Sequence, residues 1–366
     1  MGREVAGAMA RWCHVLDVDA RPELVAVCSR SVSKFQWFKE HFPTVTHAVA
    51  DYRELVANPS VDAVYCAVPH HLHQDIYCAA INAGKHLLGE KPFGIDRAAN
   101  AAIIAAAARR PEVIVRCSSE FPFFPAVQRI ARMAAAGEFG RIIEVACGFL
   151  HSSDLDPAKP VNWKRRIEEN GEYGCMGDLG MHVFHMPLRC GWRPVNVRAV
   201  LSNIIAERPD GAGGRAACAT WDNATLLCEA AGGGHTFPLV ARMQRIAPGE
   251  TNTWYLSVMG TRCSARFSTR NPRMLETMVF EPGQPQAWRQ EALGHASVYR
   301  TVTGGIFEFG FGDAMLQMLA SFCDRVARGS AGDVPFECAT VDETRATHDL
   351  FTAALVSHAK GTVEKV

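Results

Sequence analysis

Lysine, carboxylate and imidazole side chains occur in two short segments whose residue types suit proton transfer. The first is GEKPFG, residues 89–94, in which Lys91 follows an apolar run and precedes a proline. Pro92 stiffens the backbone that carries the lysine. Partial burial would lower the pKa of this lysine, so that it can donate a proton or bind a hydroxyl group. A solvated loop lysine paired with Glu90 explains the segment equally well.

The second segment is YGCMGDLGMHVFHMP, residues 173–187. If a helix begins near Gly177, then Asp178 and His182 lie one turn apart on the same face. A carboxylate beside an imidazole raises its basicity and fixes its orientation, as general base catalysis requires. Two other interpretations stay open, namely a capping Asp178 with a core histidine and a metal site of Asp178, His182 and His185. We predict no metal, because His185 would have to point the same way as His182.

Short apolar runs alternate with helical patterns in the first third of the chain. The runs are residues 23–29, 62–69, 85–90 and 112–117, and the helical patterns between them are residues 31–42, 71–84 and 96–110. Such runs suit strands that are buried on both faces. Strand and helix in alternation predict βαβ units and a parallel sheet, whereas an all-helical domain would leave the four runs unexplained.

Beyond residue 150 the strand-like stretches follow one another without helices between them. They are residues 195–206, 224–231, 237–246, 253–260 and 263–269, and two helical segments close the chain at about 311–328 and 341–359. Consecutive strands indicate an antiparallel sheet. The predicted fold is therefore α/β, with a doubly wound parallel sheet over residues 1–120. An α+β domain with a large, mostly antiparallel sheet follows over 121–366, and its final helices are free to pack back on the first domain.

Taken together, these segments resemble the Gfo/Idh/MocA oxidoreductase family. The resemblance is carried by residues 67–94 with their EKP motif, by GEFGRI at 137–142, by the G-x-x-x-D-x-G-x-H pattern at 174–182 and by GTRCSARFS at 260–268. It implies that residues 1–120 form a Rossmann-type dinucleotide-binding domain, with a nicotinamide dinucleotide lying across it, and that residues 121–366 form a substrate and oligomerisation domain. It also implies that Lys91, Asp178 and His182 face a sugar or polyol. The implied function is an NAD(P)-dependent dehydrogenase or reductase acting on CH–OH groups.

The chemistry of alcohol oxidation agrees with these three catalytic candidates. His182 would take the hydroxyl proton, Asp178 would stabilise the imidazolium, and Lys91 would hold the reacting oxygen. The segment NWKRR, residues 162–166, adds an aromatic face and cations that suit a polyhydroxyl ligand, although a surface basic cluster explains it equally well. The predicted substrate contacts are Trp163, Arg165 and His185.

The preferred cofactor depends on VAVCSRS, residues 25–31. An acid at the end of the second strand favours NAD, whereas Ser29 and Arg30 supply a hydroxyl and a cation that suit a 2′-phosphate. We therefore expect NADP rather than NAD, while an arginine here can also lie against the adenine. The resemblance further places Pro69, His73, Glu90 and Lys91 along the cofactor crevice, and His70 and His71 are either loop residues or partners of phosphate or ribose.

The first twelve residues, MGREVAGAMARW, have the pattern of a helix that follows a glycine turn. In the family that the chain resembles, this helix directs its N-terminus at the cofactor pyrophosphate. Gly2 would then be the third glycine of the fingerprint. A strand and two glycines, about ten residues, are expected ahead of Met1, and cofactor binding without them is expected to be weak. A short N-terminal helix with no preceding strand is the alternative.

Composition limits the class of partner. The 38 basic and 38 acidic side chains balance, and the sequence lacks a stretch of 18 apolar residues and a leader pattern. We therefore expect neither nucleic-acid nor membrane partners, a cytoplasmic protein with reduced cysteines, and a homodimer or homotetramer. Two competing functions stay open, a sugar-eliminating or glycosidase-type enzyme that oxidises its substrate transiently, and a non-catalytic sensor of cofactor or sugar.

Overall fold

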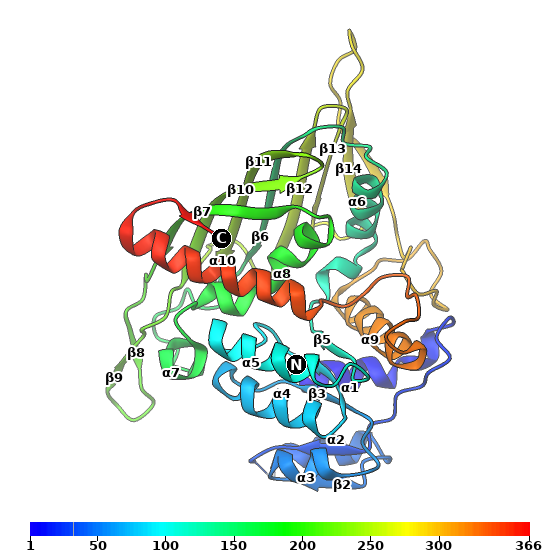
Figure 1. The fold of residues 1–366 in the computed structure, drawn as a ribbon, viewed down its shortest axis with the longest axis vertical. Coiled ribbons are helices and arrows are strands. Elements are labelled where there is room, and N and C mark those ends of the chain that lie inside the picture. Colours follow the sequence, from blue (N-terminus) through cyan, green and yellow to red (C-terminus); the bar gives the residue numbers. More distant parts are fainter. Residues whose placement is uncertain (32) are drawn as a thin grey trace.

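The first part of the chain contains short parallel strands separated by helices. The computed structural model describes residues 1–31 and 33–366 and is drawn in Figure 1. The helices are α1 (Gly2–Ala10), α2 (Ser33–His41), α3 (Tyr52–Ala57), α4 (His73–Asn82) and α5 (Arg97–Ala108), and the strands are β1 (Ala26–Cys28), β2 (His47–Val49), β3 (Ala63–Cys66), β4 (His86–Gly89) and β5 (Val115–Cys117). The four predicted strand runs are confirmed. The predicted helix at 31–42 is observed over Ser33–His41, and its residue 32 lies outside the described residues.

The parallel strands form two sheets rather than one. β1 pairs with β2, and β4 pairs with β3 on one side and β5 on the other. Between the described strands β1 and β3 there is no pairing. The element β2–α3 escaped the sequence analysis because both parts are short, although Asp51 caps α3 by accepting a hydrogen bond from the Arg53 N–H. Helix α5 begins as predicted, with Asp96 as its N-cap.

A large sheet dominates the rest of the chain. Its nine strands run in the order β15-β14-β13-β12-β6-β11-β10-β7-β16. Their bounds are β6 (Ile142–Leu150), β7 (Arg193–Ser202), β10 (Asn223–Gly232), β11 (His235–Gln244), β12 (Thr253–Gly260), β13 (Cys263–Ser268), β14 (Met274–Val279), β15 (Arg289–Ala292) and β16 (Glu364–Lys365), and β8 (Glu207–Pro209) and β9 (Arg215–Ala217) form a separate hairpin. β6 and β11 pair in parallel, and the other neighbours are antiparallel. The predicted fold class is confirmed.

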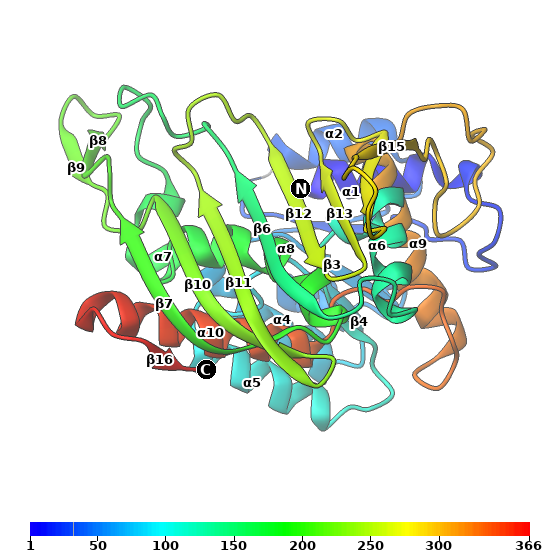
Figure 2. The same ribbon diagram turned by 90° about the horizontal axis from the view of Figure 1, so that it is seen from above.

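Helices cover one face of this sheet. They are α6 (Pro125–Ala135), α8 (Cys175–Arg189) and α10 (Val341–Lys360), with the short α7 (Ile167–Asn170) beside them and α9 (Phe311–Arg328) packed against α1. Figure 2 shows the sheet from its other side, with these helices behind the strands. Along β10 the alternate residues Ala224, Leu226 and Cys228 are buried, as expected of a sheet with one covered face.

Helix α10 joins the two parts of the chain. It runs between the large sheet and the helices of the first part (Figure 1), and it contacts α5, α8 and β7. The His348 ring on α10 lies 2.8 Å, by its Nε2, from the carbonyl oxygen of Pro92 in the EKP segment.

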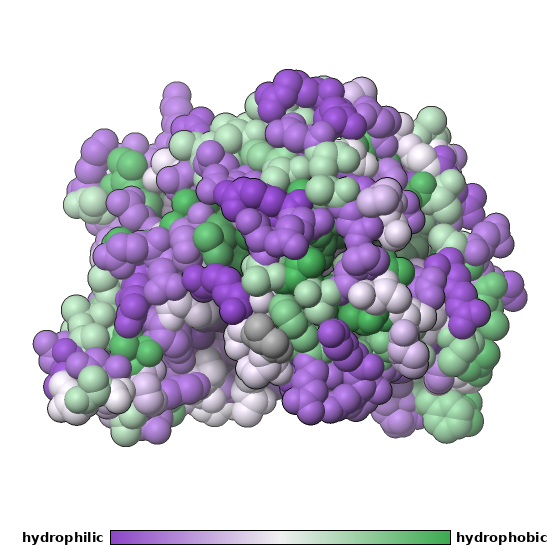
Figure 3. Space-filling model, turned by 90° about the horizontal axis from the view of Figure 1, so that it is seen from below, coloured by the Kyte–Doolittle hydropathy of each residue, from purple (hydrophilic) through white to green (hydrophobic). Residues whose placement is uncertain are grey.

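Figure 3 shows the face opposite to that of Figure 2, where hydrophobic side chains appear among the hydrophilic ones. The division at residue 120 stays a prediction.

Helix α8, which carries Asp178 and His182, is buried from Cys175 to Leu188. Two of its glycines allow neighbours to approach closely. Gly174, at the N-cap, has a φ of 56°, and a Cβ atom there would lie 2.6 Å from the Trp221 backbone nitrogen. A Cβ atom on Gly180 would lie 2.1 Å from the Phe351 ring on α10. These glycines therefore allow the close packing that fixes the depth of the helix.

The packing of α8 against α10 gives a testable expectation. Gly180→Ala should lower the free energy of unfolding by about 1–3 kcal/mol, because the added methyl group overlaps the buried Phe351 ring. Gly7→Ala in α1 is the matched control, since nothing lies within 4 Å of its added Cβ atom. The control should be neutral or stabilising by up to about 1 kcal/mol. If the thermal midpoints of the two variants fall equally, or if neither falls, the result would contradict the close packing of Gly180 against Phe351.

Candidate active site

Functional side chains gather where β3, β4 and β5 end. The register aligns Cys66, Gly89 and Cys117 across the three strands, so Glu90 and Ser118 leave the sheet at the same edge. Ligands of parallel sheets bind at this carboxyl edge. The structure thereby places the EKP segment beside residues 118–120. No role had been predicted for these three residues from the sequence.

Lys91 points into the second part of the chain. Its Nζ lies 2.9 Å from Asp178 Oδ1 and also donates to the Asp178 carbonyl oxygen, and its side chain is 14% exposed. Glu90 instead accepts a 2.6 Å hydrogen bond from the Tyr65 hydroxyl. Removal from water lowers the pKa of the Lys91 ammonium. The interpretation of Lys91 as a solvated loop residue paired with Glu90 is therefore wrong.

Asp178 is surrounded by cations. In addition to Lys91, its carboxylate accepts from Lys164 Nζ at 3.0 and 3.1 Å and from Arg245 Nη1. It also lies in the first turn of α8, where the helix dipole favours a negative charge. Burial, followed by the charges of Arg245 and Lys91, holds the pKa of Lys164 well below its usual value. Asp178 therefore acts as the anionic centre of a cluster of three cations.

The His182 imidazole lies apart from this cluster. In the described chain it shares no hydrogen bond with Asp178, and the carboxylate near it is Glu120, whose Oε2 lies 3.7 Å from Nδ1. Phe121 and Phe149 meet the ring edge-on at centroid distances of 5.3 and 5.6 Å. Burial, and then the charge of Lys91, lower the pKa of His182 well below its usual value, so the imidazole is neutral near pH 7. The predicted coupling of Asp178 to His182 is not seen.

The predicted substrate contacts occupy different surroundings. The Trp163 ring meets the His70 ring edge-on at 5.0 Å. Arg165 is 1% exposed and bonds to the carboxylates of Asp154 and Asp222. His185 lies with Arg189, its Nε2 being 3.2 Å from Nη2 of that residue. Substrate contacts by these residues stay predictions, and the structure gives Arg165 and His185 internal partners.

The predicted cofactor residues lie at several places in the first part of the chain. Ser29 and the exposed Arg30 follow β1, Pro69 precedes a 3-10 turn after β3, and Gly2 begins α1. His73 is fully buried, with Nε2 3.1 Å from the Val68 carbonyl oxygen and Nδ1 3.4 Å from the Gly94 nitrogen. The His73 ring therefore holds the EKP segment, and its contact with a cofactor stays a prediction.

The chemistry of these donors fits a nicotinamide dinucleotide. Ser29 and Arg30 offer a hydroxyl and a cation at one strand end, suited to the ribose and its substituents. Beyond β5, Ser119 Oγ is buried without a hydrogen-bond partner in the described chain, and the carboxamide of a nicotinamide is the kind of group that would satisfy it. The residues would hold the adenosine end near Arg30 and the nicotinamide end near Lys91.

Three residues of the site were missed from the sequence. Glu120 lies just beyond the predicted strand 112–117, so the rule that ligands bind at carboxyl strand ends would have found it. Lys164 belongs to the NWKRR segment but was not distinguished from its neighbours. Arg245 follows β11, and its approach to Asp178 depends on the pairing of the large sheet.

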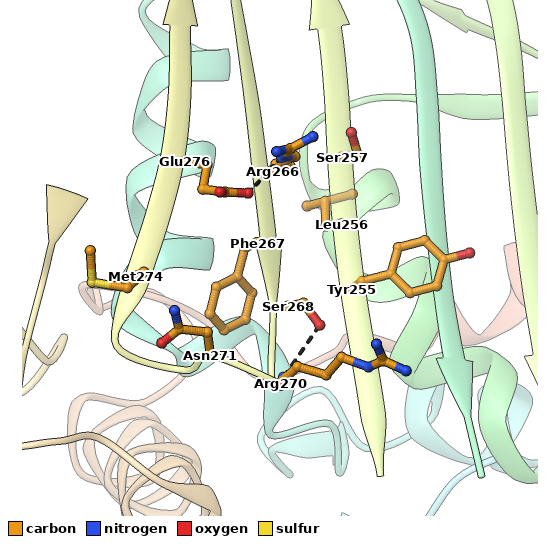
Figure 4. Close-up of a pocket in the computed structure, with 10 residues that line it drawn as sticks. All are labelled: Tyr255, Leu256, Ser257, Arg266, Phe267, Ser268, Arg270, Asn271, Met274 and Glu276. Carbon is orange, nitrogen blue, oxygen red and sulfur yellow. Dashed lines mark hydrogen bonds and ion pairs between the residues drawn. The ribbon is translucent and has the colours of Figure 1, made fainter. Parts of the chain in front are cut away.

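A hollow of about 280 Å³ lies on the other face of the large sheet (Figure 4). Trp254 faces α8, because its Nε1 donates to the His182 carbonyl oxygen. Tyr255 and Ser257, which line the hollow, therefore point the opposite way. Its other walls include Arg266 and Glu276. The hollow contains none of the predicted site residues, and we do not assign the active site to it.

Within the described ranges, 1–31 and 33–366, acidic, cysteine and histidine side chains form no group of three or more that is placed to hold a metal. The alternative metal site of Asp178, His182 and His185 is not assembled, because the three side chains have separate partners.

Among the helices of the described residues, none combines the length and the apolar character that spanning a membrane requires.

The first part of the chain is parallel-stranded, and its carboxyl edge carries Lys91, which pairs with Asp178 of α8 beneath the large sheet. The family model of the oxidoreductase family with an NAD-binding Rossmann fold, GFO_IDH_MocA, matches residues 2–119. The model of the GFO/IDH/MocA C-terminal domain matches residues 127–266. The chain belongs to the GFO/IDH/MocA family.

Its relatives include sugar dehydrogenases. Levoglucosan dehydrogenase of Pseudarthrobacter phenanthrenivorans is 29% identical over 202 residues, which cover 55% of this chain and 48% of the relative. D-xylose 1-dehydrogenase (NADP(+)) of Hypocrea jecorina is 30% identical over 172 residues, covering 45% of this chain and 43% of the relative. The matches thus span about half the length of these curated relatives.

Solved structures share the fold over the whole chain. Levoglucosan dehydrogenase in complex with NADH and L-sorbose superimposes with a TM-score of 0.89 at 23% identity, and the match covers 100% of this chain and 96% of that structure. An inositol dehydrogenase homologue from Azotobacter vinelandii, complexed with NAD+, gives a TM-score of 0.76 at 18% identity, with 96% and 99% covered. At these identities the likeness establishes the fold.

The internal role of Arg165 can be tested against the predicted substrate contact. Arg165→Met should lower the free energy of unfolding by about 3 kcal/mol or more, because Asp154 and Asp222 would lose their shared buried cation. The neighbouring Arg166→Met is the control, since the Arg166 side chain is 53% exposed, and should change it by less than about 0.5 kcal/mol. Thermal and urea unfolding without ligand provide the measurement. An unchanged stability of Arg165→Met would favour a substrate role instead.

Proposed function

We propose that this protein is an NAD(P)-dependent dehydrogenase or reductase that acts on a secondary alcohol or ketone of a sugar, polyol or sugar derivative. The observation that carries the proposal is the convergence of Lys91, at the carboxyl edge of the parallel strands, with Asp178 of α8, the helix that also carries His182. This convergence joins the cofactor-binding part of the chain to a proton-transfer group. Membership of an oxidoreductase family supports it.

The residues divide the reaction between them. A bound nicotinamide cofactor supplies hydride transfer to or from the substrate carbon. His182 exchanges the hydroxyl proton at Nε2, because Nδ1 is the ring nitrogen that lies 3.7 Å from Glu120 Oε2. Lys91, held by Asp178, donates a hydrogen bond to the reacting oxygen and stabilises negative charge on it. The aromatic walls beside His182 exclude water from the imidazole.

Sugars are the proposed substrate class because two curated relatives act on them by name, levoglucosan in one and D-xylose in the other. NADP is the proposed preference because the exposed Arg30 and Ser29 stand where an acid would favour NAD. A homodimer or homotetramer remains the predicted assembly, and the cytoplasm the predicted compartment.

A panel of sugars and polyols, offered with NAD and with NADP, tests the activity through the absorbance of the reduced nicotinamide. His182→Ala and Lys91→Met should each lower kcat by at least about 100-fold and still bind cofactor in titrations. Lys360→Met is the matched control, because the Lys360 side chain is 63% exposed near the end of α10. Loss of cofactor binding by His182→Ala would contradict its role, and cleavage of a sugar without net cofactor reduction would favour the transient-oxidation enzyme.

The preference for NADP has its own test. Arg30→Ala should raise the KM for NADP by about tenfold or more, because a charge-assisted contact to the 2′-phosphate is removed. The KM for NAD should stay within about twofold, because NAD lacks that phosphate. Equal changes for both cofactors would instead place the guanidinium against the adenine.

A further inference from the structure

Two buried polar atoms without partners face each other in the site. Glu120 Oε2 and His182 Nδ1 are 3.7 Å apart, and neither forms a hydrogen bond in the described chain. Their side chains are 4% and 7% exposed. A buried polar atom without a partner is costly, so two such atoms side by side indicate a contact that forms in another state of the site.

The residues packed around the His182 ring favour a hydrogen bond from this ring to Glu120. Phe121 and Phe149 enclose the ring edge-on, and Trp254 holds its backbone through the carbonyl oxygen. A shift of about 1 Å would bring the two atoms to a normal hydrogen-bond length. Such bonds are often long in ligand-free enzymes and tighten when the substrate is bound.

Asp178 cannot take this place. Lys91, Lys164 and Arg245 occupy its carboxylate, and no carboxylate other than Glu120 lies within 4.0 Å of a His182 ring nitrogen in the described chain. Glu120 and His182 also come from different elements, since Glu120 follows β5 and His182 lies on α8. The pair therefore couples the cofactor-binding edge to the proton-transfer group.

We propose that Glu120 is the positioning residue of His182, and that its carboxyl group determines which imidazole nitrogen carries the proton. This inference rests on the proposed function, because it assigns His182 the proton exchange with the substrate. Glu120 acts through His182 and need not touch the substrate. In this role it replaces the Asp178 that the sequence analysis expected.

Each protonation state of Glu120 favours one direction of the reaction: the carboxylate favours oxidation of the alcohol, and the protonated form favours reduction of the ketone. As a carboxylate, Glu120 accepts the Nδ1–H bond and leaves the Nε2 lone pair free. When hydride leaves the alcohol carbon for the nicotinamide, Nε2 takes the hydroxyl proton and the Nδ1 proton passes to Glu120. The products are a ketone, a reduced cofactor and a protonated Glu120 that donates to Nδ1. Reduction runs through the same steps backwards, with Nε2–H giving its proton to the new hydroxyl group.

Burial and the charges around the pair cause Glu120 to gain or lose its proton near pH 8. Glu90 and Lys91 face it from the end of β4, Tyr65 from β3, Lys164 from the segment before α7, His151 from the end of β6, and His185 from α8. Burial, and then the negative charge of Glu90, raise the pKa of Glu120 to about 8. His182 is held neutral by burial and by Lys91. Below pH 8 Glu120 is therefore the donor, and above pH 8 it becomes the acceptor.

The proton on His182 can be observed without any substrate. The protein is labelled with ¹⁵N-histidine, and His182→Gln identifies the His182 signals in long-range ¹H–¹⁵N spectra. We expect an Nε2–H imidazole at pH 6.5 that changes to Nδ1–H as the pH rises through about 8. The amide of Glu120→Gln does not titrate in this range, so the His182 tautomer of that variant should stay the same from pH 6.5 to pH 10. A tautomer change that survives in Glu120→Gln, or is absent from the unmodified protein, would overturn the proposal.

Kinetics supply the second measurement. With a substrate from the panel, kcat for oxidation should rise with pH through about 8, and kcat for reduction should fall. Glu120→Gln should lose this rise and about 100-fold of kcat at pH 9, with KM little changed, and Glu120→Asp should restore part of the activity. Glu112→Gln is the control, since the Glu112 side chain is 62% exposed. A Glu120→Gln enzyme with an unchanged pH profile would overturn the proposal.

The two measurements separate the inference from the proposed function. If no alcohol is oxidised but the His182 tautomer follows Glu120, the pairing stands and the dehydrogenase assignment fails. If alcohols are oxidised but the tautomer ignores Glu120, the assignment stands and the pairing fails. Thermal midpoints of the three Glu120 proteins show whether each is folded, and Glu120→Asp keeps the test decisive if Glu120→Gln unfolds.

Discussion

The ion pairs around Asp178 connect the parts of this protein. One carboxylate in the first turn of α8 receives Lys91 from the parallel strands, Lys164 from the segment before α7 and Arg245 from the large sheet. Burying these charges is costly, and their mutual hydrogen bonds offset that cost only when all of them are in place. The cluster therefore makes the position of the EKP lysine depend on correct docking of α8.

That docking is set by apolar packing rather than by the charges themselves. α8 is buried along its length between the large sheet and α10, and Gly180 allows the Phe351 ring to approach its backbone. On the other side, His348 holds the EKP segment through the Pro92 carbonyl oxygen. Helix α10, near the end of the chain, thus positions a lysine from its first third. Hydrophobic burial supplies the free energy, and the polar contacts select one register.

The site divides electrostatically into two halves. The Asp178 half is ionic and holds Lys91 in place, while the Glu120–His182 half is enclosed by aromatic rings and holds neutral groups. Lys91 acts on both, because its charge lowers the pKa of His182. A neutral imidazole beside a fixed ammonium is suited to exchange a proton with an oxygen that the ammonium binds.

The sequence by itself determined the types of the longer elements, the parallel and antiparallel character of the two parts, and the segments that carry Lys91, Asp178 and His182, but not the short β2 and α3. These features follow from local patterns, namely apolar periodicity, turn residues and capping residues such as Asp96. Tertiary structure alone decided the partners. The one-turn spacing of Asp178 and His182 predicted that they meet, but Lys91, Lys164 and Arg245 bind the aspartate. The carboxyl group near the histidine is that of Glu120, 3.7 Å from Nδ1. Long-range pairing of charges depends on which faces become buried together, and periodicity does not encode that.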